Sequence, residues 1–131
     1  MPVAHMLAPS WRTADFGDGS SAVAWASPLD PSETKAYTIN CASELATADN
    51  RIETLSVVPS GVATLAGLVV QEITYDRANI TLWLTIAPDA RNRSNWNGAG
   101  ETHFLTVTIT VTDGQRFERD VSLVVRQLGQ T

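Results

Sequence analysis

The sequence predicts an all-β protein, an immunoglobulin-like two-sheet β-sandwich with an extended N-terminal arm. Three observations predict this fold. From Lys35 onward apolar and polar residues alternate with a period of two, which is typical of strands with one buried face. Clusters of turn-forming residues separate the alternating stretches at short intervals. No stretch carries the 3.6-residue apolar period of a helix, and the most helix-like segment, Ser43 to Asp49, is short.

The N-terminal region differs from the rest of the chain, so we assign residues 1–27 to an arm and residues 28–131 to the sandwich. Prolines and the small-residue run from Gly17 to Ser21 interrupt any period in the arm. The arm nevertheless contains three of the chain's larger apolar side chains: Trp11, Phe16 and Trp25.

These three side chains are costly to leave in water, so they are candidate partner-binding residues. We expect them to dock on a neighbouring protein. The alternative is that the arm packs on its own sandwich as extra strands, for which Val23 to Ala26 is the best segment.

The first two predicted strands follow the arm. One carries the alternating residues Tyr37, Ile39 and Cys41, and the other carries Leu55 and Val57 and ends at the turn cluster that begins at Pro59.

The third and fourth predicted strands form a hairpin. One face of the third carries Val69, Gln71, Ile73 and Tyr75, and one face of the fourth carries Ile80, Leu82, Leu84 and Ile86. A four-residue loop over residues 76–79 places Tyr75 opposite Ile80 and Ile73 opposite Leu82, so both apolar faces lie on one side.

The last predicted hairpin is the best marked. Its first strand carries Leu105, Val107, Ile109 and Val111 on one face, and its second carries Phe117, Val121, Leu123 and Val125. A two-residue turn at Asp113-Gly114 would split these faces, whereas a three-residue loop over residues 112–114, with Gly114 in a left-handed conformation, aligns them. The predicted pairs are Ile109 with Phe117, Leu105 with Val121, and Val107 with Arg119, the one misfit.

Composition sets limits on function. The 131 residues and 44% apolar content suit one domain with one core. Fourteen acidic residues against nine basic ones give a formal charge of −5, which makes nucleic acid a poor partner because phosphate binding requires clustered cations. We expect no nucleic acid and no membrane as partners, since no apolar stretch approaches the roughly 20 residues that span a bilayer.

The sequence offers little chemistry for catalysis. Cys41 is the only cysteine, and the alternation makes it a buried, inert thiol; His5 and His103 lack further ligands at a metal-binding spacing. No phosphate-binding glycine loop and no nucleophile motif occurs. We therefore predict no catalytic residue, no cofactor and no metal site, that is, a protein that is not an enzyme. The N-terminus has no secretory signal, and we expect a soluble protein made in the cytoplasm.

A long segment between Pro88 and Glu101 has no internal period, and such loops are often functional. Arg91, Arg93 and Trp96 within it are candidate partner-binding residues. For Trp96 two interpretations stay open: a contact residue, or a plug that folds back over the end of the sandwich.

The chain from Ser27 to the C-terminus resembles the fibre-tail adaptor proteins of tailed bacteriophages. The residues that carry the resemblance are Pro28-Leu29-Asp30-Pro31-Ser32-Glu33, Tyr37-Thr38-Ile39-Asn40, Leu55-Ser56-Val57-Val58-Pro59 and Phe117-Glu118-Arg119-Asp120-Val121-Ser122-Leu123. The first segment, leading into the second, is the most specific. The chain departs from the family at Cys41, where such proteins tend to carry Trp, and in its N-terminal extension.

The resemblance implies a structural protein of the virion, assembled in the host cytoplasm, that links tail fibres to the tail or neck. Its implied partners are other virion proteins, the tail or neck ring proteins and the fibres, with several copies arranged in a ring. The family has no catalytic residues to carry over. The alternative function is a carbohydrate-binding β-sandwich, in which Trp83 and Trp96 would supply a sugar-stacking platform.

Overall fold

The structure is a computed structural model that describes residues 12–16, 22–42, 45 and 50–128. Its strands are β1 (Thr13–Asp15), β2 (Ala22–Ala24), β3 (Thr34–Asn40), β4 (Ile52–Pro59), β5 (Leu68–Tyr75), β6 (Asn79–Ile86), β7 (Glu101–Val111) and β8 (Arg116–Val125). Among the described residues there is one α-helix, α1 (Gly61–Ala66), between β4 and β5. Two short 3₁₀ turns, Pro88–Ala90 and Ser94–Trp96, lie between β6 and β7.

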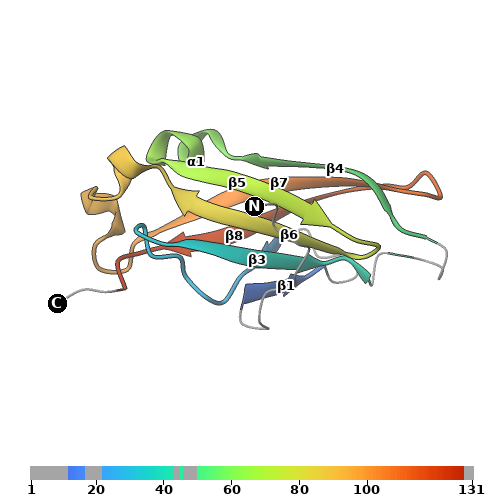
Figure 1. Ribbon diagram of the computed structural model, residues 1–131, viewed down its shortest axis with the longest axis horizontal. Helices are drawn as coiled ribbons and strands as arrows, with labels where there is room; N and C mark the ends of the chain where they lie inside the picture. The colour runs from blue at the N-terminus through green and yellow to red at the C-terminus, as the bar shows by residue number, and fades with distance from the viewer. Residues whose placement is uncertain (1–11, 17–21, 43–44, 46–49, 129–131) are drawn as a thin grey trace.

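The strands form two four-stranded sheets that pack together as a β-sandwich (Figure 1). Sheet A has the strand order β1-β3-β6-β5, and sheet B has the order β2-β8-β7-β4. Both sheets are mixed because β1 pairs parallel with β3 and β2 pairs parallel with β8. The predicted two-sheet β-sandwich is confirmed.

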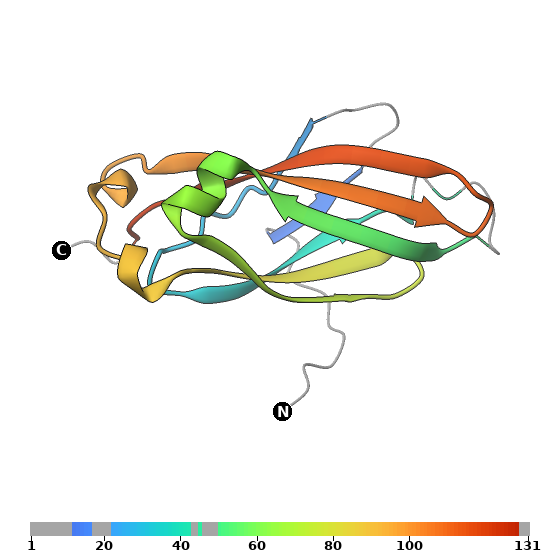
Figure 2. The ribbon, with the colours of Figure 1, turned by 90° about the horizontal axis from the view of Figure 1, so that it is seen from above.

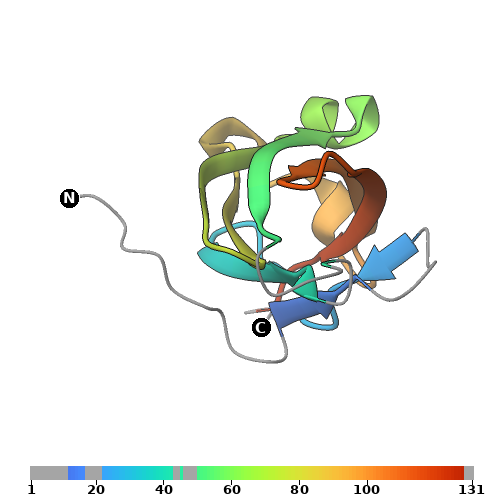
Figure 3. The ribbon, with the colours of Figure 1, turned by 90° about the vertical axis from the view of Figure 1, so that its right-hand side faces the viewer.

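The core fills the space between the two sheets, which wrap around it when the molecule is viewed end-on (Figure 3). The alternation predicted from the sequence supplies the inward faces: Leu105, Val107, Ile109 and Val111 of β7 are each at most 1% exposed. Burial of each such side chain stabilises the fold by roughly 1.5–3 kcal/mol. Cys41 is also buried, and its sulfur is not part of a disulfide.

The β7–β8 hairpin has the predicted register. Its pairs include Ile109 with Phe117, Leu105 with Val121 and Val107 with Arg119. The Gly114 amide donates to the Val111 carbonyl at 2.9 Å, and Gly114 has a φ of 93°. The three-residue loop and the left-handed glycine are therefore both confirmed.

The β5–β6 hairpin confirms the predicted pairs Tyr75 with Ile80 and Ile73 with Leu82. The predicted face of β5 is wrong in its first half, because the register shifts between Val70 and Glu72. A β-bulge adds one residue to a strand and so exchanges the two faces on either side of it. Val69 consequently lies opposite Thr85, and it does not share the face of Ile73.

The assignment of residues 1–27 to an arm is corrected in part, because two segments of that region are strands of the sandwich. β1 lies beside β3 in sheet A, and β2 lies beside β8 in sheet B. Phe16 is fully buried and Trp25 is 3% exposed, and both belong to the core cluster. For these segments the alternative interpretation, extra strands on the chain's own sandwich, is the one observed.

The helix α1 was not predicted. Its N-terminus is capped by Ser60, whose hydroxyl accepts a hydrogen bond from the Ala63 amide at 3.0 Å. Its C-terminus ends at Gly67, which has a φ of 108°. The two caps define a single short helix that has no apolar stripe longer than Ala63 and Ala66. Most of the helix-like segment 43–49 lies outside the described residues.

Gly114→Val should lower the free energy of unfolding by about 1–2 kcal/mol, because a β-branched residue is strained at a positive φ. An added Cβ would meet no atom within 4 Å, so the expected cost comes from the backbone alone. Gly61→Ala is the control, since Gly61 also has open space around it but lacks a positive φ. Thermal melting of Gly114→Val at the wild-type temperature would contradict the register.

Candidate functional site

One end of the sandwich brings together segments that are far apart in the sequence (Figures 1 and 2). It contains α1, residues 87–100, residues 27–33 and the C-terminal residues 126–128; we call it the loop end. Hydrogen bonds join these segments, among them those from Arg93 Nη1 to the Leu65 carbonyl, from the Gln127 amide to the Trp96 carbonyl, and from the Leu128 amide to Asp30 Oδ2.

Trp96 is a plug inside the loop end. Its side chain is fully buried, its indole Nε1 donates to the Ala90 carbonyl at 2.8 Å, and its ring meets that of His103 edge-on with centroids 5.8 Å apart. The Gln127 amide donates to its carbonyl at 2.8 Å. The sequence left two interpretations open for Trp96, and the structure supports the plug that folds back into the end of the sandwich.

His103 connects the plug to the surface of the loop end. It is 2% exposed, and its Nε2 lies 3.0 Å from Glu101 Oε1. The other carboxylate oxygen of Glu101 accepts a hydrogen bond from Asn95 Nδ2, also at 3.0 Å. The buried histidine thus has a polar partner, as a buried polar group requires, and the partner also fixes the loop.

Arg91 and Arg93 are held against backbone carbonyls on the outside of the plug. Arg91 Nε donates to the Ile86 carbonyl at 2.9 Å, and Arg93 Nη1 donates to the Leu65 carbonyl of α1 at 2.9 Å. Within the described parts of the chain, neither guanidinium forms an ion pair with a carboxylate. Each arginine therefore places a positive charge at the loop end in a fixed position.

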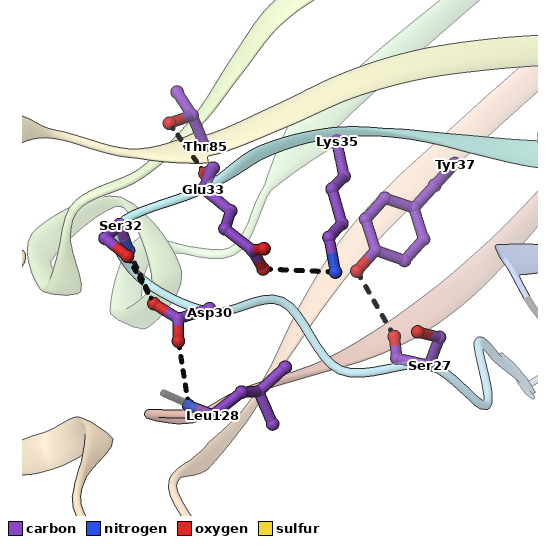
Figure 4. Close-up of polar contacts among 8 residues, drawn as sticks. All are labelled: Ser27, Asp30, Ser32, Glu33, Lys35, Tyr37, Thr85 and Leu128. Atoms are coloured by element: carbon purple, nitrogen blue, oxygen red, sulfur yellow. Dashed lines mark hydrogen bonds and ion pairs between the residues drawn. The ribbon is translucent and has the colours of Figure 1, made fainter. Parts of the chain in front are cut away.

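Asp30 joins the segment that follows β2 to the C-terminal segment that follows β8 (Figure 4). Although it is an acidic residue, it is only 5% exposed. Its Oδ1 accepts hydrogen bonds from the Ser32 amide at 2.9 Å and the Ser32 hydroxyl at 2.7 Å, and its Oδ2 accepts one from the Leu128 amide at 2.8 Å. We call this arrangement the Asp30 clasp; such bonds to a carboxylate are stronger than those between neutral groups.

Backbone pairing next to the clasp continues the β2–β8 contact. The Leu29 amide donates to the Val124 carbonyl at 2.9 Å, and the Arg126 amide donates to the Leu29 carbonyl at 3.0 Å. Leu29 itself is fully buried. The first segment of the family resemblance, residues 28–33, therefore has a defined role in holding the fold together.

Trp25 and Tyr37 form an aromatic pair beneath this segment. Their ring centroids are 5.0 Å apart, Trp25 Nε1 donates to the Thr38 carbonyl at 2.9 Å, and the Tyr37 hydroxyl donates to the Ser27 carbonyl at 3.2 Å (Figure 4). Burial raises the pKa of Tyr37 far above its ordinary value. Lys35 and Glu33 form a nearby ion pair at 3.1 Å, which is partly exposed and stabilises little.

Of the six predicted partner-binding residues, Trp11 lies outside the described residues. Phe16, Trp25 and Trp96 are buried in the chain's own core, so the prediction that their side chains contact a partner is corrected. Each side chain fills space between the sheets or at the end of the sandwich, where the burial of its apolar surface stabilises the fold. Arg93 is exposed and Arg91 is half-buried, and their role in binding stays a prediction.

Sequence reasoning missed an exposed apolar surface beside the two arginines. Val58 of β4, Val62 and Leu65 of α1 and Phe104 of β7 are 56%, 70%, 80% and 47% exposed. Phe104 could have been identified from the sequence, since it shares one face of β7 with the threonines that alternate with the buried residues. Leu65 could not have been identified in this way, because the sequence did not predict the helix α1 that exposes it.

Comparison with known proteins adds no family assignment. No protein-family model matches the chain, and no curated protein matches it. Within the described ranges, no helix is long and apolar enough to cross a membrane. The same residues bring no three His, Cys, Asp or Glu side chains together in a way that could hold a metal ion.

Asp30→Asn should destabilise the protein by about 1–3 kcal/mol, because an amide offers one acceptor in place of two and leaves a buried donor unsatisfied. Ser32→Ala removes only the hydroxyl bond and should cost about 0.5–1.5 kcal/mol. Urea denaturation of both variants measures the difference. Equal stability of Asp30→Asn and wild type would show that the clasp does not hold the two segments together.

Tyr37→Phe should make the stability less sensitive to alkaline pH. Because the pKa of Tyr37 is raised by burial, the unfolded chain releases this proton above about pH 10 while the folded chain keeps it. The free energy of unfolding therefore falls as pH rises past about 10, and the phenyl ring removes this contribution. Denaturation at pH 8 and at about pH 10.5 tests this, with Tyr75→Phe, at an exposed ring, as the control. Equal slopes for Tyr37→Phe and wild type would contradict it.

Proposed function

We propose that this protein is a structural, non-catalytic component of a tailed-bacteriophage virion, an adaptor that links tail fibres to the tail or neck. The observation that carries the proposal is the segment Pro28–Glu33, by which the chain most specifically resembles fibre-tail adaptors. Asp30 in this segment is buried and bonded both to Ser32 and to Leu128. The resemblance thus falls on residues with a defined role in the fold.

We also propose that the sandwich is immunoglobulin-like in topology. The strand order supports this: β3, β6 and β5 are neighbours in sheet A, and β8, β7 and β4 are neighbours in sheet B. An immunoglobulin constant-type domain places its strands B, E and D in one sheet and G, F and C in the other. Taking β3 as strand B and following the chain gives the same grouping. The parallel pairing of β1 with β3 is a departure.

The proposed partners are other virion proteins, namely the ring proteins of the tail or neck and the fibres. An exposed apolar surface at the loop end supports a role in protein contacts, since such surfaces often mark interaction sites. Several copies arranged in a ring would make heterologous contacts that close on themselves. The proposed location is accordingly the virion.

No observation favours the alternative function, carbohydrate binding. It requires Trp83 and Trp96 to form one exposed stacking platform. Trp96 is fully buried beside His103, whereas Trp83 lies in the middle of sheet A, opposite Ala36 and Glu72. The two rings therefore offer no common surface to a sugar.

Mass spectrometry of purified particles tests the proposed function. The chain should be present in intact particles at several copies per tail, and it should remain after treatments that remove loosely bound host proteins. Its absence from particles, together with glycan-array binding by the isolated chain, would reject the adaptor function and favour the carbohydrate-binding one. A particle map with a single unpaired copy would reject the ring.

A further inference from the structure

The strands β4 and β7 and the helix α1 meet at the loop end (Figure 2), and each of them carries exposed apolar side chains. We call the surface formed by Val58, Val62, Leu65 and Phe104 the contact face. Val58 lies opposite Thr106 in the β4–β7 pairing, and the Ser60 amide donates to the Phe104 carbonyl. Val58 and Phe104 are thus close neighbours on the outer side of sheet B, and α1 begins immediately after Ser60.

The helix α1 directs its larger side chains away from the core. Ala63 and Ala66 are buried, whereas Val62 and Leu65 are 70% and 80% exposed. A helix that only covers a core places its large apolar residues inward. Here the two alanines suffice to seat the helix, and the two larger apolar side chains are left in water, where they cost free energy unless another surface covers them.

Positive charge adjoins this helix. Arg93 donates to the Leu65 carbonyl, so its guanidinium lies at the C-terminal end of α1, and Arg91 is fixed two residues away in the chain. Nothing in the described ranges places a carboxylate within ion-pair distance of either arginine. A guanidinium has five N–H donors, so most of those on Arg93 are available to an incoming carboxylate.

We propose that the contact face binds an acidic amphipathic segment of a partner protein. Apolar side chains of the segment would cover Val62, Leu65 and Phe104, and its carboxylates would pair with Arg93 and Arg91. The chain's net charge of −5 does not prevent this, because at physiological salt charges beyond roughly 8 Å are screened. Of the acidic residues at the loop end, Asp30 is bonded to Ser32 and Leu128 and Glu33 is paired with Lys35, which leaves Asp89 against Arg91, Arg93 and Arg126. The inference rests on the proposed function only in taking the partner to be another virion protein.

A second copy of the chain fits the contact face less well. In a symmetric dimer the same patch meets itself, so the arginines of the two copies would approach each other around a shared apolar centre. Like charges held close together oppose association. An acidic partner segment instead satisfies the apolar face and the charges together.

Selection from a random peptide library tests the chemistry without knowledge of the partner. The whole chain serves as the target, and Leu65→Gln serves as the counter-target that removes peptides bound elsewhere. The retained peptides should combine bulky apolar residues with Asp or Glu. Retained peptides that are basic or uncharged, or a library that yields none, would overturn the proposal.

Variants then test the site with a fluorescently labelled retained peptide. Leu65→Gln should weaken binding roughly tenfold or more, because it removes apolar burial, and Arg93→Gln should weaken it roughly two- to fivefold. Val69→Gln and Arg116→Gln are matched controls, exposed and outside the contact face, and should bind as wild type does. Unchanged melting temperatures show that the variants are folded.

Three outcomes would overturn the proposal. Arg116→Gln could weaken binding as much as Arg93→Gln, which would mean that general charge and not the loop end attracts the peptide. Leu65→Gln could bind as wild type does. Sedimentation could show that the chain self-associates and that Leu65→Gln abolishes this, in which case the occupant is a second copy. Selection uses the isolated chain, so its result is independent of whether the protein is found in particles.

Discussion

The pairing of β7 with β8 determines where the rest of the chain lies, because each strand carries a further strand on its other edge. β4 pairs with β7, and β2 pairs with β8, so sheet B is built outward from this hairpin. A slip of one residue would turn the inward face of β7 to solvent and remove its four largest contributions to the core. The left-handed Gly114 prevents that slip by allowing an odd loop. A single glycine thus controls the position of the apolar residues on both strands.

The sequence predicted the parts of the fold in which two independent signals agree. In the β7–β8 hairpin, alternation and turn chemistry together allow only one register. In β5, the alternation of residues in the sequence was the only signal. This alternation continues unchanged past the bulge near Gln71, where the two faces of the strand are exchanged. The strands β1 and β2 are three residues long, too short to show a period, and the pairing that forms them is with distant residues. Their recruitment to the sandwich depends on burial of Phe16 and Trp25.

The loop end was predictable in position and not in detail. The length of segment 88–101 and its lack of period indicated a special region, and Arg91 and Arg93 are indeed on its surface. Sequence could not decide between a contact role and a plug for Trp96, because the cavity that receives it is formed by His103, Ala90 and the C-terminal residues together. The exposed side of α1 could not be predicted for a related reason: a six-residue helix between two caps is too short to show a 3.6-residue period.

The parallel contact between β2 and β8 has a mechanical consequence. Tension between the N-terminal side of β2 and the C-terminal side of β8 pulls along the two strands in opposite directions, so their connections are loaded in shear. The bonds that Trp25 and Leu29 donate to β8, the bond that Arg126 donates to Leu29, and the bond that Leu128 donates to Asp30 would then share the force instead of breaking one after another. A domain with this geometry resists extension through its ends far better than one whose terminal strands can be peeled apart.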